Sequence, residues 1–185
     1  MELTDKIFAA AAYIRGKIPQ TPEIGLILGS GLGDYADTLE DAVCIPFSEI
    51  PNFPVPTVAG HSGALIIGKR QGKAVVCLQG RIHYYEGLTM REITLPVRVL
   101  AALGVKKLVL TNAAGGVNMF YSPGDLMLIS DHINYSGMNP LIGPNLEAFG
   151  PRFPDMSDLY TASLRAAIKE KAAANGITLQ EGVYA

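Results

Sequence analysis

The chain has 185 residues, of which 49% are hydrophobic and only 17% are charged, and this composition excludes disorder as its main state. Its 15 Lys and Arg against 17 Asp and Glu give a formal net charge of −2, which argues against a protein that binds nucleic acid by neutralising many phosphates. Its two cysteines, Cys44 and Cys77, imply no disulfide framework and fit a reducing, cytoplasmic location. The sequence shows no signal peptide and no apolar run of about 18 residues, so we expect no membrane contact.

Hydrophobic spacing predicts helices and strands that alternate along the chain. The predicted helices cover 3–14, 89–103 with a kink or break at Pro96, and 157–175 with Gly176 as its stop. The predicted strands cover 23–28, 64–67, 74–78, 108–111, 126–129 and 177–185, and 69–72 joins two of them as a hairpin. Residues 134–154 form a long loop rich in Gly, Pro and Asn. The pattern indicates an α/β protein with one domain over 1–185. Because the sequence stops inside a strand, we expect a truncated chain.

The first candidate for chemistry is the glycine cluster 29–33, Gly-Ser-Gly-Leu-Gly, which lies between a predicted strand and a helical stretch over 32–39. Such a turn lets backbone N–H groups approach an anion closely, and Ser30 adds a hydroxyl donor. A dinucleotide-binding fingerprint would need glycine where Asp34 stands, and the Gly-Lys-Ser/Thr ending of a nucleotide P-loop is missing. A dinucleotide-binding domain is therefore disfavoured, whereas a tight turn without a ligand stays an alternative.

The second candidate is the segment 79–87, QGRIHYYEG, which follows a predicted buried strand. In an extended segment, alternation would place Arg81, His83 and Tyr85 on one side. These residues would offer a bidentate guanidinium, an imidazole and a phenol to one ligand. Glu86 is near enough in sequence to orient His83. A solvated hairpin end is the alternative reading of this segment.

Two more loops flank predicted strands, Gly-His61-Ser-Gly before one and Thr-Asn-Ala113-Ala-Gly-Gly after another. Loops that adjoin the strands in this way meet along one edge of a sheet. We therefore predict a phosphate site built from Ser30, Arg81, His83 and backbone N–H groups near Ala113. The three histidines, His61, His83 and His132, are too scattered to indicate a metal site. Ser30 also lacks the G-x-S-x-G spacing of a hydrolase nucleophile.

Seven motifs occur in the order seen in the trimeric, 6-oxopurine-type purine nucleoside phosphorylases: LILGSGLG, TVAGHSG, QGRIHYYEG, TNAAGGVN, GDLMLISDHIN, GPN and RFPDMSDLY. The sequence resembles this family from about Ile24 to Tyr184. The resemblance implies an α/β fold in which a mixed central sheet curls into a distorted barrel flanked by helices. It also implies a pentosyltransferase of purine salvage. Such an enzyme converts a purine (2′-deoxy)ribonucleoside and phosphate into free base and (2-deoxy)ribose 1-phosphate.

The resemblance also assigns roles to residues of this chain. The residues similar to the family's phosphate ligands are Ser30, His61, Arg81, His83 and Ala113, the last through its backbone N–H. Glu86 resembles the residue that orients His83, so His83 and Glu86 form the expected catalytic pair. Tyr85 resembles the ribose contact, and Tyr184 resembles a wall of the nucleoside pocket. Phe153 resembles an aromatic residue that enters a neighbouring subunit's site, which implies a homotrimer. The resemblance implies no metal or organic cofactor, with phosphate as co-substrate.

The sequence departs from the family pattern after Tyr184. In the family, a base-binding Glu follows, and then a Ser on the phosphate, an Asn on the purine and a His on the ribose hydroxyl. Without these groups, we expect residues 1–185 alone to be a poor catalyst. Two alternatives stay open: an enzyme like the methylthioadenosine phosphorylases, and a non-catalytic module that binds phosphate or nucleoside.

Overall fold

The computed structural model describes residues 1–56 and 63–185. The backbone forms two compact units, residues 1–113 with 140–149 and residues 114–139 with 150–185. The expectation of a single domain over 1–185 stays a prediction.

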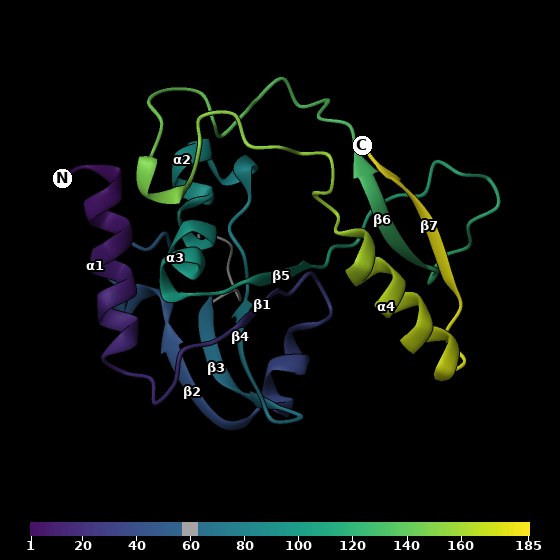
Figure 1. The fold of residues 1–185 in the computed structure, drawn as a ribbon, viewed down its shortest axis with the longest axis horizontal. Coiled ribbons are helices and arrows are strands. Elements are labelled where there is room, and N and C mark those ends of the chain that lie inside the picture. Colours follow the sequence, from purple (N-terminus) through teal and green to yellow (C-terminus); the bar gives the residue numbers. More distant parts are fainter. Residues whose placement is uncertain (57–62) are drawn as a thin grey trace. The chain divides into compact units, whose positions relative to one another are not determined.

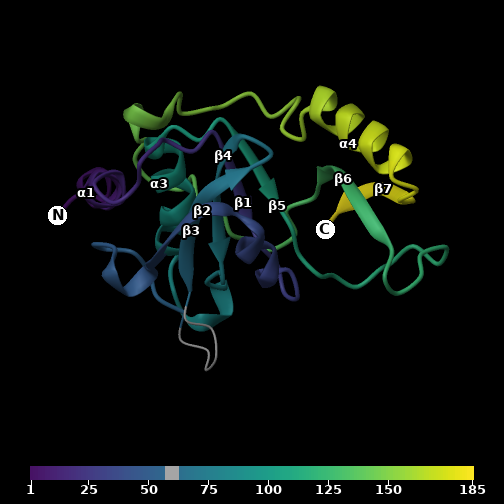
Figure 2. The same ribbon diagram turned by 90° about the horizontal axis from the view of Figure 1, so that it is seen from below.

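A five-stranded mixed sheet organises the first unit, with strand order β2-β3-β4-β1-β5 (Figure 1). Its strands are β1 (Ile24–Ile27), β2 (Glu40–Pro46), β3 (Ala64–Arg70), β4 (Lys73–Gln79) and β5 (Lys107–Leu110). The strands β4, β1 and β5 run parallel and side by side, while the β2–β3 and β3–β4 pairs are antiparallel (Figure 2). The predicted hairpin is confirmed, since β3 and β4 pair from Ala64 opposite Gln79 to Arg70 opposite Lys73.

Two helices bury apolar side chains in the core on one face of this sheet, α1 (Leu3–Arg15) and α3 (Leu95–Leu103). The spacing of Ile7, Ala11 and Ile14 brings them onto the buried face of α1. The cluster that they form with α3 and with alternate residues of the strands includes Val99, Leu103, Leu65, Ile67, Val76 and Leu78. Period-2 alternation of the strands therefore assigns one set of side chains to this face.

The other face of the sheet carries a smaller cluster, which includes Ala64, Ile66 and Cys77 from the strands. A 3₁₀-helix, Gly33–Thr38, contributes the fully buried Ala36 to it. Burial raises the pKa of the Cys77 thiol to about 11, so this cysteine stays a protonated, unreactive core residue near neutral pH.

The predicted elements of this unit are confirmed, with two differences of detail and one omission. The region 89–103 is two helices, α2 (Met90–Ile93) and α3, and the break falls at Thr94 because Pro96 occupies the first turn of α3. The stretch 32–39 forms a six-residue 3₁₀-helix instead of an α-helix. Strand β2 was not predicted from the sequence. It is an edge strand with a register shift between Glu40 and Val43, and such an irregularity erases simple alternation.

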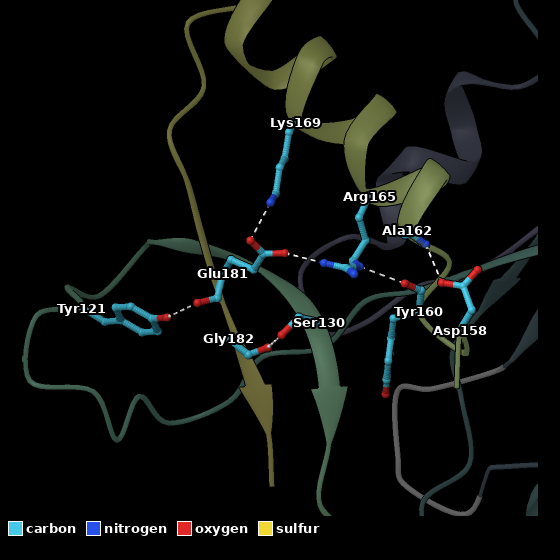
Figure 3. Close-up of polar contacts among 9 residues, drawn as sticks. All are labelled: Tyr121, Ser130, Asp158, Tyr160, Ala162, Arg165, Lys169, Glu181 and Gly182. Carbon is cyan, nitrogen blue, oxygen red and sulfur yellow. Dashed lines mark hydrogen bonds and ion pairs between the residues drawn. The ribbon is translucent and has the colours of Figure 1, made fainter. Parts of the chain in front are cut away.

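The second unit is a β-α-β arrangement of β6 (Leu126–His132), α4 (Ala162–Ala174) and β7 (Leu179–Tyr184) (Figure 1). The two strands pair in parallel, as a helical crossover permits. Glu181 on β7 forms ion pairs with two residues of α4, Arg165 at 2.6 Å and Lys169 at 2.5 Å (Figure 3). These cations lower the pKa of the Glu181 carboxyl, chiefly through the hydrogen bond from Lys169. Charged side chains thus join the helix to the strand.

Helix α4 begins at Ala162, several residues later than the sequence predicts. The preceding residues satisfy their backbone locally, because the Asp155 carboxylate accepts from the Ser157 N–H at 2.9 Å and the Asp158 carboxylate accepts from the Ala162 N–H at 2.8 Å. Among the described strands, the five-stranded sheet is open, with β2 and β5 at its edges, so a closed barrel stays a prediction. None of the helices in the described part of the chain has the length and apolar character that a membrane crossing needs.

Candidate functional site

Three of the sequence-predicted phosphate loops lie at one edge of the first unit's sheet. Ile27 of β1 pairs in parallel with Leu78 of β4 on one side and with Leu110 of β5 on the other. Since parallel strands end at the same edge, the loops that follow these three residues emerge together. They carry Ser30, Arg81 and Ala113.

Antiparallel β3 begins at the same edge, with Ala64 opposite Gln79, and the fourth predicted loop precedes it in the sequence. Gly63 precedes that strand, and a Cβ atom on Gly80 would lie 3.2 Å from the Gly63 Cα. The backbones of the two loops therefore pass very close to each other. His61 lies outside the described residues, so its place in the site stays a prediction.

The loop after β1 packs directly on the loop after β5. Gly29 is buried, and a Cβ atom there would lie 2.6 Å from the Thr111 carbonyl oxygen and 2.8 Å from the Asn112 Cα. Only glycine fits this contact between two backbones. Ser30 and Ala113 follow as exposed residues of the two loops. The 3₁₀-helix after the first loop is too short to supply a helix dipole, so this loop can contribute only its backbone N–H groups and the Ser30 hydroxyl to an anion site.

Arg81 and His83 are brought together beyond the end of β4. The Arg81 guanidinium donates from Nε to His83 Nε2 at 3.2 Å and from Nη1 to the Thr111 carbonyl at 2.9 Å. These bonds use two of the five N–H groups of a guanidinium and fix its plane. The contact with Thr111 ties the β4 loop to the end of β5.

Glu86 fixes His83 from the other side. Its carboxylate accepts the His83 backbone N–H at 2.7 Å and lies 3.3 Å from His83 Nδ1, with only 2% of the Glu86 side chain exposed. Since Nε2 accepts from Arg81, the proton of a neutral imidazole must sit on Nδ1, facing the carboxylate. The arrangement is a chain from Glu86 through His83 to Arg81. The predicted pairing of His83 with Glu86 is present in the structure.

Tyr85 stacks on His83, with ring centroids 4.7 Å apart and an interplanar angle of 13°. The segment is not fully extended as the sequence suggested, because Tyr84–Glu86 forms a 3₁₀ turn that ends at Gly87 with φ 91°. The turn still places Tyr85 beside His83. Tyr85 remains 76% exposed, so its ring can contact a ligand.

The two other candidate residues belong to the second unit. Phe153 is 86% exposed, and the Arg152 guanidinium lies 5.6 Å from its ring centroid. Tyr184 lines a cavity of about 520 Å³ together with His132, Tyr135, Tyr160 and neighbouring residues of the second unit.

Sequence reasoning did not single out Tyr160, although it reaches His132 in this cavity. Its hydroxyl lies 3.2 Å from His132 Nδ1, and the two rings meet edge to face at 5.8 Å between centroids. Burial raises the pKa of the Tyr160 hydroxyl, and Asp131 and Tyr184 add to the rise. Tyr160 is therefore a phenol that stays protonated. The sequence carried one signal for it, because RFPDMSDLY is among the recognised motifs and Tyr160 is its last residue.

In the described part of the chain, no three His, Cys, Asp or Glu residues gather as metal ligands would. The arrangement at the sheet edge instead offers a guanidinium, a hydroxyl and loop amides as donors, with the His83 imidazole beside them. This set of hydrogen-bond donors suits an oxyanion.

The family profile described as "Phosphorylase superfamily" matches residues 23–185, and the chain belongs to this superfamily. It is 58% identical over 175 residues to purine nucleoside phosphorylase 1 of Geobacillus stearothermophilus, covering 95% of this chain and 64% of that protein. It is 52% identical over 182 residues to purine nucleoside phosphorylase 1 of Bacillus subtilis, covering 98% and 67% respectively. Within the superfamily, the chain is thus a member of the purine nucleoside phosphorylase family. It spans about two thirds of the length of these relatives.

The fold agrees with this assignment. A solved structure of purine nucleoside phosphorylase from Schistosoma mansoni, in complex with inosine, superposes with a TM-score of 0.92 at 44% identity. The match covers 97% of this chain and 65% of that protein. The α/β architecture with a mixed sheet and flanking helices is therefore that of the purine nucleoside phosphorylases.

Proposed function

We propose that the protein catalyses phosphorolysis of purine (2′-deoxy)ribonucleosides to free base and (2-deoxy)ribose 1-phosphate, a step of purine salvage. The observation that carries the proposal is the chain Glu86–His83–Arg81 at the edge where three loops of the family motifs converge. The names of the two bacterial relatives and the inosine bound to the Schistosoma mansoni protein support the same reaction.

In this proposal, phosphate binds among Ser30, His61, Arg81, His83 and the Ala113 N–H. A phosphate oxygen attacks C1′ of the ribose as the bond from C1′ to the purine nitrogen breaks, and the electron pair of that bond leaves with the base. Positive charge develops on the ribose during this step, and the bound phosphate dianion stabilises it. Holding phosphate and nucleoside side by side also removes much of the entropic cost of bringing them together.

Glu86 and His83 act as one unit in this reaction. The carboxylate holds the Nδ1 proton and keeps Nε2 directed toward Arg81 and the phosphate position. Nε2 can take a proton from a phosphate hydroxyl once the Arg81 Nε–H turns from Nε2 to the phosphate, and the resulting imidazolium lies beside the nearly buried Glu86 carboxylate, which stabilises its charge. Tyr85, stacked on His83, contacts the ribose.

We infer that Phe153 and Tyr184 contact the nucleoside, as the family resemblance implies, and that Phe153 does so in a neighbouring copy of a homotrimer. An aromatic side chain that is 86% exposed has little of its own unit to pack against. We also infer a mixed sheet that curls into a barrel, as the family resemblance implies, and a cytoplasmic location, which the two cysteines without a disulfide framework favour. An enzyme like the methylthioadenosine phosphorylases is the less favoured alternative, because both relatives above carry the name purine nucleoside phosphorylase.

The test is the phosphate dependence of inosine cleavage by protein expressed from its complete natural reading frame. ³¹P NMR should show ribose 1-phosphate forming from inosine and phosphate, with no cleavage when phosphate is left out. Arg81→Ala should weaken phosphate binding by about 1.5–3 kcal/mol, the usual contribution of a charge-assisted hydrogen bond. Arg70→Ala is the matched control, because Arg70 is exposed and donates only to the Thr38 carbonyl among its described contacts. Phosphate binding without any cleavage would support a non-catalytic binding module instead.

A further inference from the structure

The Thr111 hydroxyl ties the start of the Gly29–Gly33 loop to the sheet. It accepts the Gly29 N–H at 2.8 Å and donates to the Ile27 carbonyl at 3.1 Å. The Thr111 backbone N–H donates to the same Ile27 carbonyl at 3.0 Å, which locks Thr111 in register with β1. The first residue of the loop is therefore fixed by a side chain of the neighbouring strand end.

Gln79 ties the end of the same loop. Its side-chain amide donates to the Gly33 carbonyl at 3.1 Å. Gln79 is the last residue of β4 and is half-buried, so the strand holds its position. The loop is thus held at its first and last residues, and Ser30 lies between the two tethers.

Thr111 also sets the position of Arg81, because its carbonyl accepts from Arg81 Nη1 at 2.9 Å. One residue therefore contacts both the loop that carries Ser30 and the Arg81 guanidinium. Thr111 uses its hydroxyl, its N–H and its carbonyl for these contacts. Its two hydrogen-bond donors, the hydroxyl and the backbone N–H, both donate to the Ile27 carbonyl and so do not donate to phosphate.

We propose that Thr111 and Gln79 are positioning residues that hold the Gly29–Gly33 loop in the conformation that binds phosphate. The inference rests on the proposed function, since it names what the loop is held for. Apparent affinity falls in proportion to the fraction of molecules in the binding conformation. A loop that loses a tether spends less time in that conformation, so phosphate binds more weakly even though no ligand group has been removed.

The experiment compares Thr111→Val, which keeps the shape but removes the hydroxyl, with Thr111→Ser, which keeps the hydroxyl. Isothermal titration with inorganic phosphate should show affinity on the order of tenfold weaker for Thr111→Val, as expected when a hydrogen bond to a buried N–H is lost. Thr111→Ser should bind close to wild type. Thr94→Val is the matched control, because it removes a part-buried hydroxyl that donates to the Met90 carbonyl, away from the phosphate loops.

A second readout separates positioning from general stability. Amide hydrogen exchange at Gly29 should be slow in wild type and fast in Thr111→Val, while Thr94→Val leaves it slow. Gln79→Met should weaken phosphate binding by a smaller factor, and it decides the matter if Thr111→Val does not fold. Wild-type phosphate affinity in the folded tether variants would overturn the inference. A wild-type protein that binds no phosphate would overturn the proposed function instead, and Gly29 exchange would still show whether the tether exists.

Discussion

The two units of the chain differ in how they are stabilised. The first buries a large cluster of apolar side chains from α1, α3 and the sheet, with several residues such as Ile7, Leu65 and Val99 fully inaccessible. In the described part of the second, Ala172 is the one buried residue, while Val117, Met119, Phe120 and Tyr135 are each more than 90% exposed. The elements of the second unit are held to one another by the pairing of β6 with β7 and by the ion pairs of Glu181 with α4.

This difference matches the proposed roles of the two units. The phosphate loops need fixed backbones, and they rise from a sheet that is packed on both faces. The nucleoside candidates Phe153 and Tyr184 belong to a unit that exposes large apolar side chains. Exposed apolar surface of this kind marks a site of interaction with a ligand or another chain. We therefore expect substitutions at backbone contacts in the first unit to reduce folding stability. Substitutions of exposed aromatic residues in the second unit should instead weaken association of the protomers.

The largest expected effect concerns assembly. Phe153→Ala should weaken association of the protomers by about 2–4 kcal/mol, because aromatic anchors dominate interfaces. Light scattering over a dilution series measures the shift toward monomer. Phe120→Ala is the control, since Phe120 is also exposed on the second unit but lies outside the proposed nucleoside site. A wild-type protein that is monomeric throughout would contradict the homotrimer.

An effect of intermediate size concerns the backbone contact in the first unit. Gly29→Ala should destabilise folding by about 1–3 kcal/mol, because its Cβ would overlap the backbone of Thr111 and Asn112. Gly115→Ala in the second unit is the matched change, as its Cβ meets no atom within 4 Å. Urea unfolding compares the two variants. Equal loss of stability in both would break the contrast between a tightly packed unit and an open one.

The smallest expected effect concerns pH and the second unit. Because Lys169 and Arg165 lower the pKa of Glu181 in the folded chain, the ion pairs stabilise the fold above the carboxyl's usual pKa of 4.5. That contribution disappears as the pH falls through the lowered folded pKa. Glu181→Gln should therefore unfold slightly more easily than wild type near neutral pH, and the gap should close in acid.

Thermal unfolding from neutral pH to below pH 4.5, repeated at high salt, measures this gap. Glu170→Gln is the control, because Glu170 is exposed and pairs with the adjacent, equally exposed Lys171. A gap between Glu181→Gln and wild type that widens in acid would contradict the assigned role of Glu181.

Most of the fold could be predicted from the sequence, because burying one face of a helix or strand makes apolar residues recur at a regular spacing. Helix α1 and strands β3 and β4 carry that signal clearly, and each lies where it was expected. Strand β2 does not, since its edge position leaves most of its residues exposed and Asp41 adopts a φ of 53°. The predicted start of α4 was several residues too early, because the Asp155 and Asp158 carboxylates accept backbone N–H groups there and hold turns before the helix begins.

The candidate site was predictable only in part. Arg81, His83 and Tyr85 lie together as expected, although a 3₁₀ turn rather than alternation brings Tyr85 onto His83, and the spacing of Glu86 indicated its contact with His83. The role of Thr111 could not be predicted, because its contacts join residues that are more than 80 positions away along the chain. The contact between Tyr160 and His132 likewise joins residues that are 28 positions apart. Such long-range contacts leave no periodic trace in a sequence.

The central claim is that the loops after β1, β4 and β5 bind phosphate at their shared edge. The most direct measurement is a crystal structure of the protein grown or soaked at a phosphate concentration that saturates binding in solution. The account predicts phosphate within hydrogen-bonding distance, about 2.7–3.2 Å, of the Arg81 guanidinium, the Ser30 hydroxyl and the Ala113 N–H, with His83 beside it. An empty edge in that crystal, or phosphate bound only elsewhere on the molecule, would contradict it.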